Sequence, residues 1–344
     1  MRRSLALLLA GALLLSLVPA VVYAVSGGVT GQTKGGNSAP TISAVSLVES
    51  TSDNVVTAMT PLSPYRVKVT AGDINTIDDI REIEFHVFYQ TDGAQWDADA
   101  LAIFKWSKAS GWSMQNGTAA TTWELVAIDC TAPADFSGTT GDWYLKFKPG
   151  KLAQATSLQG WRCSAIVRDE SKSDAGVWGA GASMSAYSEL AFDATGVVFG
   201  DAIAGIEPGS TGYITDPAAN RLTVRVTSNA QYSLGVKSAA TWSGGSNTIA
   251  LSGLAGVPSA AEQFSLTIDN QSKGGGLPGQ PKKPQAMTGS TVTVSGYEAV
   301  SRVTTGVGAP EGTGDHLMYM GMSLSLMGIQ EVVYSGTITF TTAN

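Results

Sequence analysis

EVVYSGTITFTTAN (residues 331–344) alternates apolar and polar side chains as a β-strand does. Val332, Tyr334, Ile338 and Phe340 fall on one side of an extended chain, and serine and threonine side chains fall on the other. Successive side chains leave a strand on opposite faces, so this alternation is typical of a half-buried strand. The stretch predicts that these residues form a strand packed in a sheet.

Similar strand-length runs recur through most of the chain, separated by turn-forming clusters of Gly, Asp and Asn. The chain also holds 40 glycines in 344 residues, which suits many short turns. Short strands without a sustained helical period predict an all-β protein of the β-sandwich class. The stretch GDINTIDDIREI (residues 72–83) is the one place where we expect a helical turn.

The runs fall into two series with different compositions. Residues 171–184 are rich in Gly, Ala and Ser, which predicts a long loop or a joint, and a short strand at 188–193 follows. Seven of the eight tryptophans, Trp96 to Trp178, precede this joint, and only Trp242 follows it. The two series are therefore not expected to be copies of one another.

We interpret the series as two sandwich domains in tandem, at residues 41–193 and 194–344. Within the second domain, residues 272–289 combine Gly, Pro and Lys, which are unsuited to a central strand. This segment is expected to be an exposed loop.

The N-terminal residues 1–24 have the form of a secretory signal peptide. Two arginines precede an apolar stretch from Leu5 to Val18, and small residues follow. We expect cleavage after Ala24, with cleavage after Ala20 as the second choice and an uncleaved membrane anchor as the alternative interpretation. Residues 25–40 are rich in Gly, Ser and Thr, and are expected to form a flexible arm.

Export would leave an acidic chain. Without Arg2 and Arg3, the 21 Lys and Arg fall to 19 against 28 Asp and Glu, a net charge of −9. An acidic chain without a basic cluster is a poor partner for nucleic acid or anionic lipid. No second apolar stretch approaches the ~18 residues that a membrane span needs, so we expect no span in the mature chain.

The chain has two cysteines, Cys130 and Cys163, each in a strand-like run. A pair of cysteines in an exported chain predicts one disulfide, and two buried free thiols are the alternative.

Several segments resemble known families. TISAVSLVES (41–50) and YRVKVTAGDINTIDDIREIEFHVFY (65–89) resemble the Ig-like modules of large prokaryotic surface proteins. LTVRVTSNAQYSLGVK (222–237) and YSGTITFTT (334–342) are similar to secreted sandwiches of the WxL-like and pilin-like kind. The Trp-x-Leu pair that defines WxL domains is absent, with Thr339-Phe340-Thr341 in the closing strand instead. The resemblance implies a role in the cell envelope, in adhesion or in assembly.

No catalytic motif stands out. The two histidines, His86 and His316, lie in different predicted domains, and the sequence has no nucleophile elbow, zinc-protease helix or phosphate-binding glycine loop. His86 is expected at a surface or interface. A pair of carboxylates working as acid and base stays open as an alternative, but we expect no enzyme.

One segment offers oxygen ligands for Ca²⁺, namely Asp73, Asn75, Asp78 and Asp79. Loops between strands commonly gather the six to eight oxygens that Ca²⁺ prefers. The alternative is a set of solvated turns, since Asp and Asn also stabilise turns through their own side chains. No other cofactor is expected.

Two further patterns have a functional and a structural interpretation. His316, Met318, Met320 and Met322 share one face of a strand, where they could hold Cu(I) or simply pack in the core. The tryptophans before the joint could form a sugar-binding platform. The alternative is that these tryptophans pack in the core, and this is where we expect Trp143 and Trp161.

The sequence thus predicts a non-enzymatic extracellular protein at the cell surface. We expect a structural subunit of a surface layer or filament, whose partners are copies of itself or other envelope proteins and whose contacts use sandwich surfaces and edges. The alternative function is a secreted adhesion or carbohydrate-binding module, with glycans as partners and Ca²⁺ in a structural role.

Overall fold

The computed structural model describes residues 36–89, 102–115, 123–199, 221–255, 258, 260–270, 285–303, 314–325 and 327–344. The predicted signal peptide (1–24), residues 25–35 of the arm and residues 272–284 of the predicted loop lie outside them. No helix in the described part of the chain is long and apolar enough to cross a membrane.

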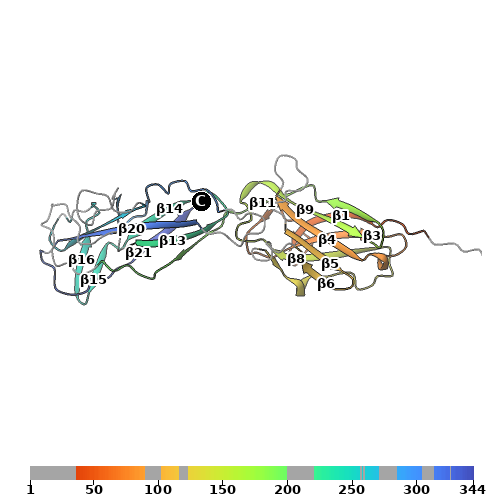
Figure 1. Cartoon of the computed structure of the whole chain (residues 1–344), viewed down its shortest axis with the longest axis horizontal. Helices are drawn as coiled ribbons and strands as arrows, with labels where there is room; N and C mark the ends of the chain where they lie inside the picture. The colour runs from red at the N-terminus through yellow and green to blue at the C-terminus, as the bar shows by residue number, and fades with distance from the viewer. Residues whose placement is uncertain are drawn as a thin grey trace, which may run out of the picture. The chain divides into compact units, whose positions relative to one another are not determined.

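The all-β prediction is confirmed: strands dominate Figure 1, and the described residues contain no α-helix. The strands of the N-terminal half are β1 (Thr41–Glu49), β2 (Ala58–Met59), β3 (Tyr65–Gly72), β4 (Glu82–Tyr89), β5 (Ala102–Ser107), β6 (Gly111–Met114), β7 (Glu124–Leu125), β8 (Thr140–Lys148), β9 (Thr156–Arg168), β10 (Ser173–Val177) and β11 (Ala182–Met184). They form a four-stranded sheet in the order β1-β3-β8-β7 and a larger sheet in the order β2-β11-β9-β4-β5-β6, with β10 also paired to β9.

These two sheets pack against each other through the alternating apolar side chains of their strands. In β3, Val67, Val69 and Ala71 are fully buried, while the residues between them face outward. Aromatic rings meet across the two sheets: the Phe104 and Phe147 ring centroids lie 5.9 Å apart. Burial of such rings contributes much of the stability of a core. This face-to-face packing is the arrangement of a β-sandwich.

The stretch at residues 72–83 contains the expected helical turn, a short 3-10 helix at Ile77–Asp79. Residues 171–184, predicted to be a long loop or a joint, instead contain two strands. Strand β10 pairs with β9, and β11 pairs with both β9 and β2. Small residues suit this region because strands approach closely there; a Cβ at Gly176 would lie 2.5 Å from Ile42 Cγ2.

The C-terminal half holds a second pair of sheets. Its strands are β12 (Ser188–Phe192), β13 (Arg221–Ser228), β14 (Ser233–Ser238), β15 (Thr241–Gly244), β16 (Asn247–Leu251), β17 (Gln263–Asp269), β18 (Gln285–Ala286), β19 (Val292–Thr293), β20 (Gly314–Leu324) and β21 (Ile338–Ala343). The larger sheet has the order β12-β13-β20-β17-β16-β15, with β18 paired to β17, and the smaller sheet has the order β19-β14-β21.

Two predicted boundaries differ from this arrangement. Strand β12, which we assigned to the first domain, pairs with β13 in the second pair of sheets, because Leu190 and its neighbours align antiparallel with Val226. The predicted exposed loop 272–289 ends early: Gln285 and Ala286 pair with β17, and Met287 is fully buried.

Each pair of sheets has its own cluster of buried side chains. The fully buried Asn229 connects segments from both halves: its Nδ2 atom donates to the carbonyls of Ala153 (2.8 Å) and Ser185 (3.0 Å), and its Oδ1 atom accepts from the N–H of Tyr187. Contacts group Ser38–Asn344 into one compact unit. The division of this stretch into two domains therefore stays a prediction.

The methionine face of β20 belongs to the core, as one of our two interpretations predicted. Met318 and Met320 are fully buried, and Met322 is nearly so. The neighbouring Leu317 points away from the core and keeps 39% of its surface exposed.

This packing gives a matched test on adjacent residues. We expect Met318→Ala to lower the free energy of unfolding by about 2–5 kcal/mol, because it leaves a cavity in the core. Leu317→Ala should cost less than about 1 kcal/mol. Denaturant unfolding of both variants measures the difference, and a larger loss for Leu317→Ala would show that β20 has the opposite face buried.

Candidate functional site

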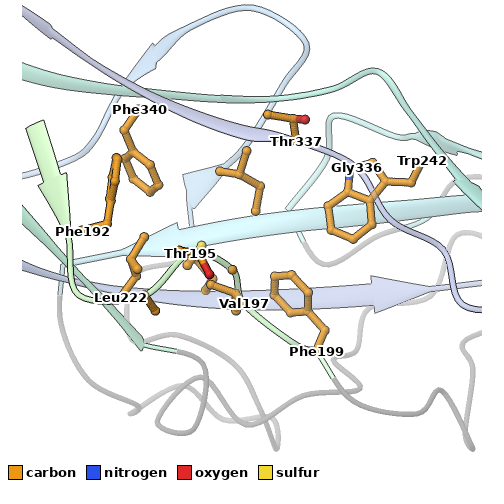
Figure 2. Close-up of a pocket in the computed structure, with 13 residues that line it drawn as sticks. Phe192, Thr195, Val197, Phe199, Leu222, Trp242, Gly336, Thr337 and Phe340 are labelled. Carbon is orange, nitrogen blue, oxygen red and sulfur yellow. The ribbon is translucent and has the colours of Figure 1, made fainter.

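The candidate site is an apolar cavity of about 460 Å³ at one edge of the second pair of sheets. Figure 2 shows side chains from separate segments gathered around it. Its lining residues are Phe192, Ala194, Thr195, Gly196, Val197, Phe199, Leu222, Trp242, Met320, Gly336, Thr337, Ile338 and Phe340. We call this cavity, together with the adjacent edge of β21, the edge groove.

Two aromatic pairs contribute to the lining of the groove. One pair is Phe192 from β12 and Phe340 from β21, whose ring centroids lie 5.7 Å apart. The other is Phe199 and Trp242 from β15, whose ring centroids lie 6.0 Å apart. Alanine, threonine and glycine at 194–196 are exposed, and Phe192 keeps 45% of its surface exposed. The wall between the pairs is therefore built of small residues and is open to solvent.

Strand β21 borders the groove with an unused edge. Among the described residues, β21 hydrogen-bonds to β14 on one side and to no strand on the other. Near the C-terminal end of β21, the side chain of Thr342 contacts Ser188 of β12, with 2.7 Å between the two Oγ atoms. Alternate N–H and C=O groups of an edge strand point away from its sheet, so this edge offers hydrogen bonds to another chain.

The sequence of β21 does not protect this edge. Exposed edges are usually blunted by lysines, prolines or bulges, which discourage pairing with other chains. Residues 335–344 (SGTITFTTAN) contain no charged side chain and no proline. Their threonine, isoleucine and phenylalanine content favours strand pairing.

The groove offers no acid–base chemistry of its own. None of the described residues lining it has a titratable side chain; its polar side-chain groups are the hydroxyls of Thr195 and Thr337 and the indole N–H of Trp242, which donates to Ser238. An apolar cavity of this size suits apolar side chains or a small apolar ligand.

Two of the four residues predicted to bind Ca²⁺ have other partners in the structure. The Asp73 carboxylate accepts the N–H of Asn75 at 2.8 Å, which is the turn-stabilising role given as the alternative. Asp78 forms an ion pair with Lys108 at 2.6 Å, and Asp79 belongs to the 3-10 helix. Across the described ranges, no three His, Cys, Asp or Glu side chains converge as metal ligands. The calcium site stays a prediction.

His86 is buried rather than on the surface, since its strand β4 lies between β5 and β9. Its Nε2 atom lies 2.5 Å from Glu84 Oε1. This hydrogen bond lowers the pKa of the Glu84 carboxyl. Arg168 binds both Glu84 and Glu82, so these two acids are engaged in ion pairs.

His316 lies in the other half, also buried. Its Nε2 atom and the hydroxyl of Tyr232 are 2.5 Å apart, and the ring of Tyr297 lies 4.5 Å from its own. Burial lowers the pKa of His316 and raises the pKa of Tyr232 to about 12. The pair is therefore held neutral inside the core near neutral pH.

The predicted disulfide between Cys130 and Cys163 is not formed in the structure, where both are free thiols. Cys130 lies beside β8, where its sulfur accepts the N–H of Lys146 at 3.1 Å and lies 3.5 Å from the carbonyl of Val126. Cys163 is buried in the middle of β9, opposite Val87 of β4. Both thiols lie in the same core cluster, and no disulfide joins them in the structure.

The tryptophans of the first half pack inside it. Trp106, Trp123, Trp143, Trp161 and Trp178 are buried, as we expected for two of them. Trp112 packs partly buried against the same cluster, and Trp96 lies outside the described residues. None of the six described tryptophans is placed to form an exposed sugar-binding platform.

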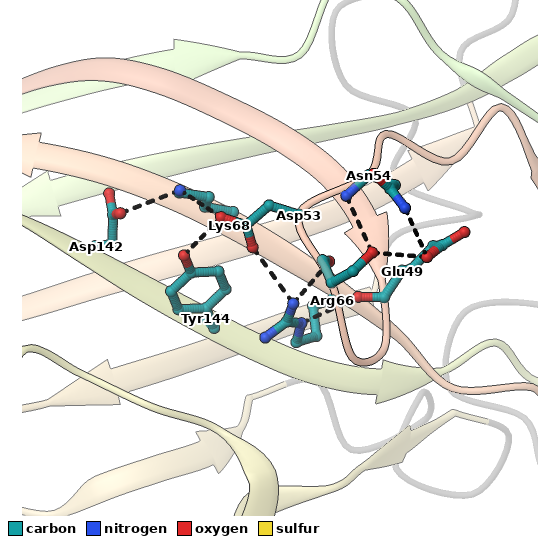
Figure 3. Close-up of polar contacts among 8 residues, drawn as sticks. Glu49, Asp53, Asn54, Arg66, Lys68, Asp142 and Tyr144 are labelled. Atoms are coloured by element: carbon teal, nitrogen blue, oxygen red, sulfur yellow. Dashed lines mark hydrogen bonds and ion pairs between the residues drawn. The ribbon is translucent and has the colours of Figure 1, made fainter.

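A polar network covers the outer face of the sheet β1-β3-β8-β7 (Figure 3). Lys68 lies 2.8 Å from Asp53 and 3.1 Å from Asp142, and Arg66 lies over the ring of Tyr144. The hydrogen bond from Lys68 is the main cause that lowers the pKa of Asp53. The charges of Arg66, Lys68, Asp53 and Asp142 are thus paired with one another within the chain.

The sequence predicted the strands around the groove but not the groove itself. Phe192, Phe199 and Trp242 each stand in or beside a predicted strand. Nothing in their spacing shows that they meet, because they come from segments that only the folded sheets bring together. The uncharged closing stretch is the one signal that pointed to this edge.

The thiols provide a test. Burial raises the pKa of Cys130 to about 11 and also raises the pKa of Cys163, so the thiolate is scarce at pH 8. Relative to an exposed thiol of pKa 9.0, Cys130 should react with a thiol reagent about 100-fold more slowly. Denaturing the protein without reductant should release two reactive thiols per chain. Finding none in the denatured chain would show a disulfide.

The polar network gives a pH test. Because the folded state lowers the pKa of Asp53, this carboxylate stabilises the fold above its unfolded pKa, near 3.8. The contribution is lost as the pH falls through the folded pKa. Asp53→Asn should cost at most about 1 kcal/mol at pH 7, since the ion pair is half exposed. Unfolding curves of the two proteins should converge near pH 2; a constant difference would contradict the assignment.

Comparison with known proteins adds no family to these observations. No protein-family model matches the chain, and no curated protein matches it. The resemblance to Ig-like, WxL-like and pilin-like modules therefore stays a prediction.

Proposed function

We propose that this chain is a non-enzymatic, extracellular structural protein of a cell envelope. It acts as a subunit of a surface layer or filament and assembles through the surfaces and edges of its β-sandwiches. Its partners are copies of itself or other envelope proteins, and a signal peptide exports it to the cell surface.

The observation that carries this proposal is the edge of β21 that pairs with no other strand among the described residues. An uncharged strand that has no partner on one edge among the described residues, next to an apolar groove, is suited to pairing with a strand from another molecule. Strand addition of this kind gains affinity from main-chain hydrogen bonds and specificity from pockets for alternate side chains.

The chemistry of the polar residues supports the same proposal. Glu82 and Glu84 are bound by Arg168, and His316 is hydrogen-bonded to Tyr232 in the core. These groups stabilise the fold where they lie. Among the described residues that line the groove, none has a side chain that exchanges a proton near neutral pH.

The test places a charge at the β21 edge. We expect the chain Val25–Asn344 to form large assemblies, and Thr341→Lys to weaken assembly by about tenfold or more, because a lysine on an edge strand opposes pairing with another strand. Sedimentation velocity measures the size distribution, and electron microscopy shows whether the assemblies are ordered.

Thr293→Lys is the matched control, because Thr293 is exposed and lies on β19, at the opposite edge of the same sheet. This variant should assemble like the wild type, and both variants should keep the wild-type melting temperature. A wild-type chain that stays monomeric at every concentration, with no ordered array on native cells, would refute the proposed function.

A further inference from the structure

We propose that His316, Tyr232 and Tyr297 form an acid-sensitive clasp between the two sheets of the C-terminal pair. The clasp holds these sheets together while His316 is neutral and loosens them when His316 gains a proton. This inference goes beyond the proposed function, because it concerns the single chain and holds whether or not copies assemble.

The clasp joins one sheet to the other. His316 lies on β20, between β13 and β17 of the larger sheet, and Tyr232 directly precedes β14 of the smaller sheet. The Nε2 atom of His316 and the hydroxyl of Tyr232 are 2.5 Å apart, and both side chains are buried. The ring of Tyr297 packs on His316 with 4.5 Å between the ring centroids. This polar contact therefore spans the apolar core cluster between the two sheets.

The backbone around the clasp leaves the pair little freedom to move. Two hydrogen bonds between the backbones of Tyr232 and Val300, of 2.7 and 2.9 Å, fix the position of Tyr232. A Cβ at Gly314 would lie 2.9 Å from the Tyr232 hydroxyl oxygen and 3.4 Å from His316 Nε2. Only glycine suits such a close approach, so there is little space beside the pair for water or a counterion.

The strands of the larger sheet supply no acid that could neutralise a positive charge on His316. The residue opposite His316 on β13 is the fully buried Val224. Asp315 leaves β20 on the other face, where it is half exposed and lies 3.5 Å from Arg225. Asp269 of β17 is paired with Tyr319, whose side chain also leaves β20 on the face away from His316.

The groups contributed from the smaller sheet and its loops do not neutralise the charge either. Burial raises the pKa of Tyr232 to about 12 and also raises the pKa of Tyr297, so both phenols stay uncharged. On the segment that carries Tyr297, Glu298 is exposed and its carboxylate accepts the N–H of Gly296. Arg302 on the same segment is itself a cation. A proton on His316 would thus place an uncompensated charge in the core.

Protonation acts on the clasp in two ways. An unpaired charge in an apolar environment costs free energy. The hydrogen bond changes as well: the Tyr232 hydroxyl donates to Nε2 of neutral histidine, whereas Nε2 of the protonated ring is a donor. The Tyr232 O–H then loses its acceptor inside the core. Both effects oppose the contact between the sheets, as in other switches that use a buried histidine.

The direction of the pH effect follows from this geometry. Burial lowers the pKa of His316 below its ordinary value of 6.5, and the opposing effect of Asp315 is smaller. As the pH falls below 6.5, the unfolded chain therefore binds a proton that the folded chain does not. The stability due to neutral His316 is complete above that pH and is lost between it and the folded pKa.

The first test compares the unfolding of the chain Val25–Asn344 with that of His316→Gln, whose amide oxygen accepts the Tyr232 hydroxyl but does not titrate. Urea unfolding from about pH 4.5 to about pH 7.5 gives the unfolding equilibrium constant of each protein. We expect the ratio of wild type to variant to rise by up to about tenfold per pH unit below 6.5, and to level off below the folded pKa.

His86→Gln is the matched control, since His86 is the chain's other histidine and lies on β4 in the N-terminal half. This variant should keep the loss of stability that His316 causes. It also leaves a single histidine ring, so the NMR signals of that ring report the titration of His316 directly. The wild type, with two histidine rings, gives the same titration if either variant fails to fold.

Hydrogen exchange locates the loosening. Between about pH 7 and about pH 5, amides of β14 and of the first residues of β20 should lose protection, after correction for intrinsic exchange rates, before those of β3 and β8 do. Equal loss in both halves would overturn the inference. So would a folded pKa of His316 at or above 6.5, or a stability ratio that stays flat with pH. These measurements use dilute protein, so a wild type that never assembles would refute the proposed function and leave the clasp standing.

Discussion

The backbone of a strand at the edge of a sheet must find hydrogen-bond partners beyond that sheet, and β21 is where this constraint matters most in the described chain. Its Phe340 side chain is buried in the second core and packs against the partly exposed ring of Phe192. Its inner edge is satisfied by β14. Its outer edge has no strand beside it among the described residues, and the sequence places neither charge nor proline there to protect it. The proposed assembly uses this edge, at which the described residues supply no partner strand.

The remaining charged surfaces contrast with that edge. On the outer face of the sheet β1-β3-β8-β7, Lys68 is bound between Asp53 and Asp142. Elsewhere, Lys108, which follows β5, is bound to Asp78 of the 3-10 helix. Exposed ion pairs of this kind contribute little energy each. They do consume the polar groups that might otherwise bind a partner or a metal ion, so the uncharged edge of an acidic chain remains as the surface suited to contact between copies.

Buried polar groups in this protein stabilise the fold. His316 shares a hydrogen bond with Tyr232, and Asn229 satisfies carbonyls from two segments far apart in the sequence. Cys130 is bound by the backbone of Lys146. A buried polar group costs free energy unless it is paired, so such networks fix a unique arrangement of strands. The same residue types in the sequence had suggested a disulfide and a copper-binding alternative.

The sequence by itself determined the all-β class, because side-chain alternation is a local property of a strand, as in β3, β20 and β21. It also indicated the buried methionines and the uncharged closing stretch. It did not determine which strands pair: β12 joins β13 rather than the first sandwich, and β10 and β11 occupy a stretch expected to be a loop. Only the tertiary structure brought Phe192, Trp242 and Phe340 to one groove and placed Cys130 and Cys163 as free thiols in one buried cluster. Pairing and proximity depend on contacts between distant segments, and the local pattern of side chains carries no information about those contacts.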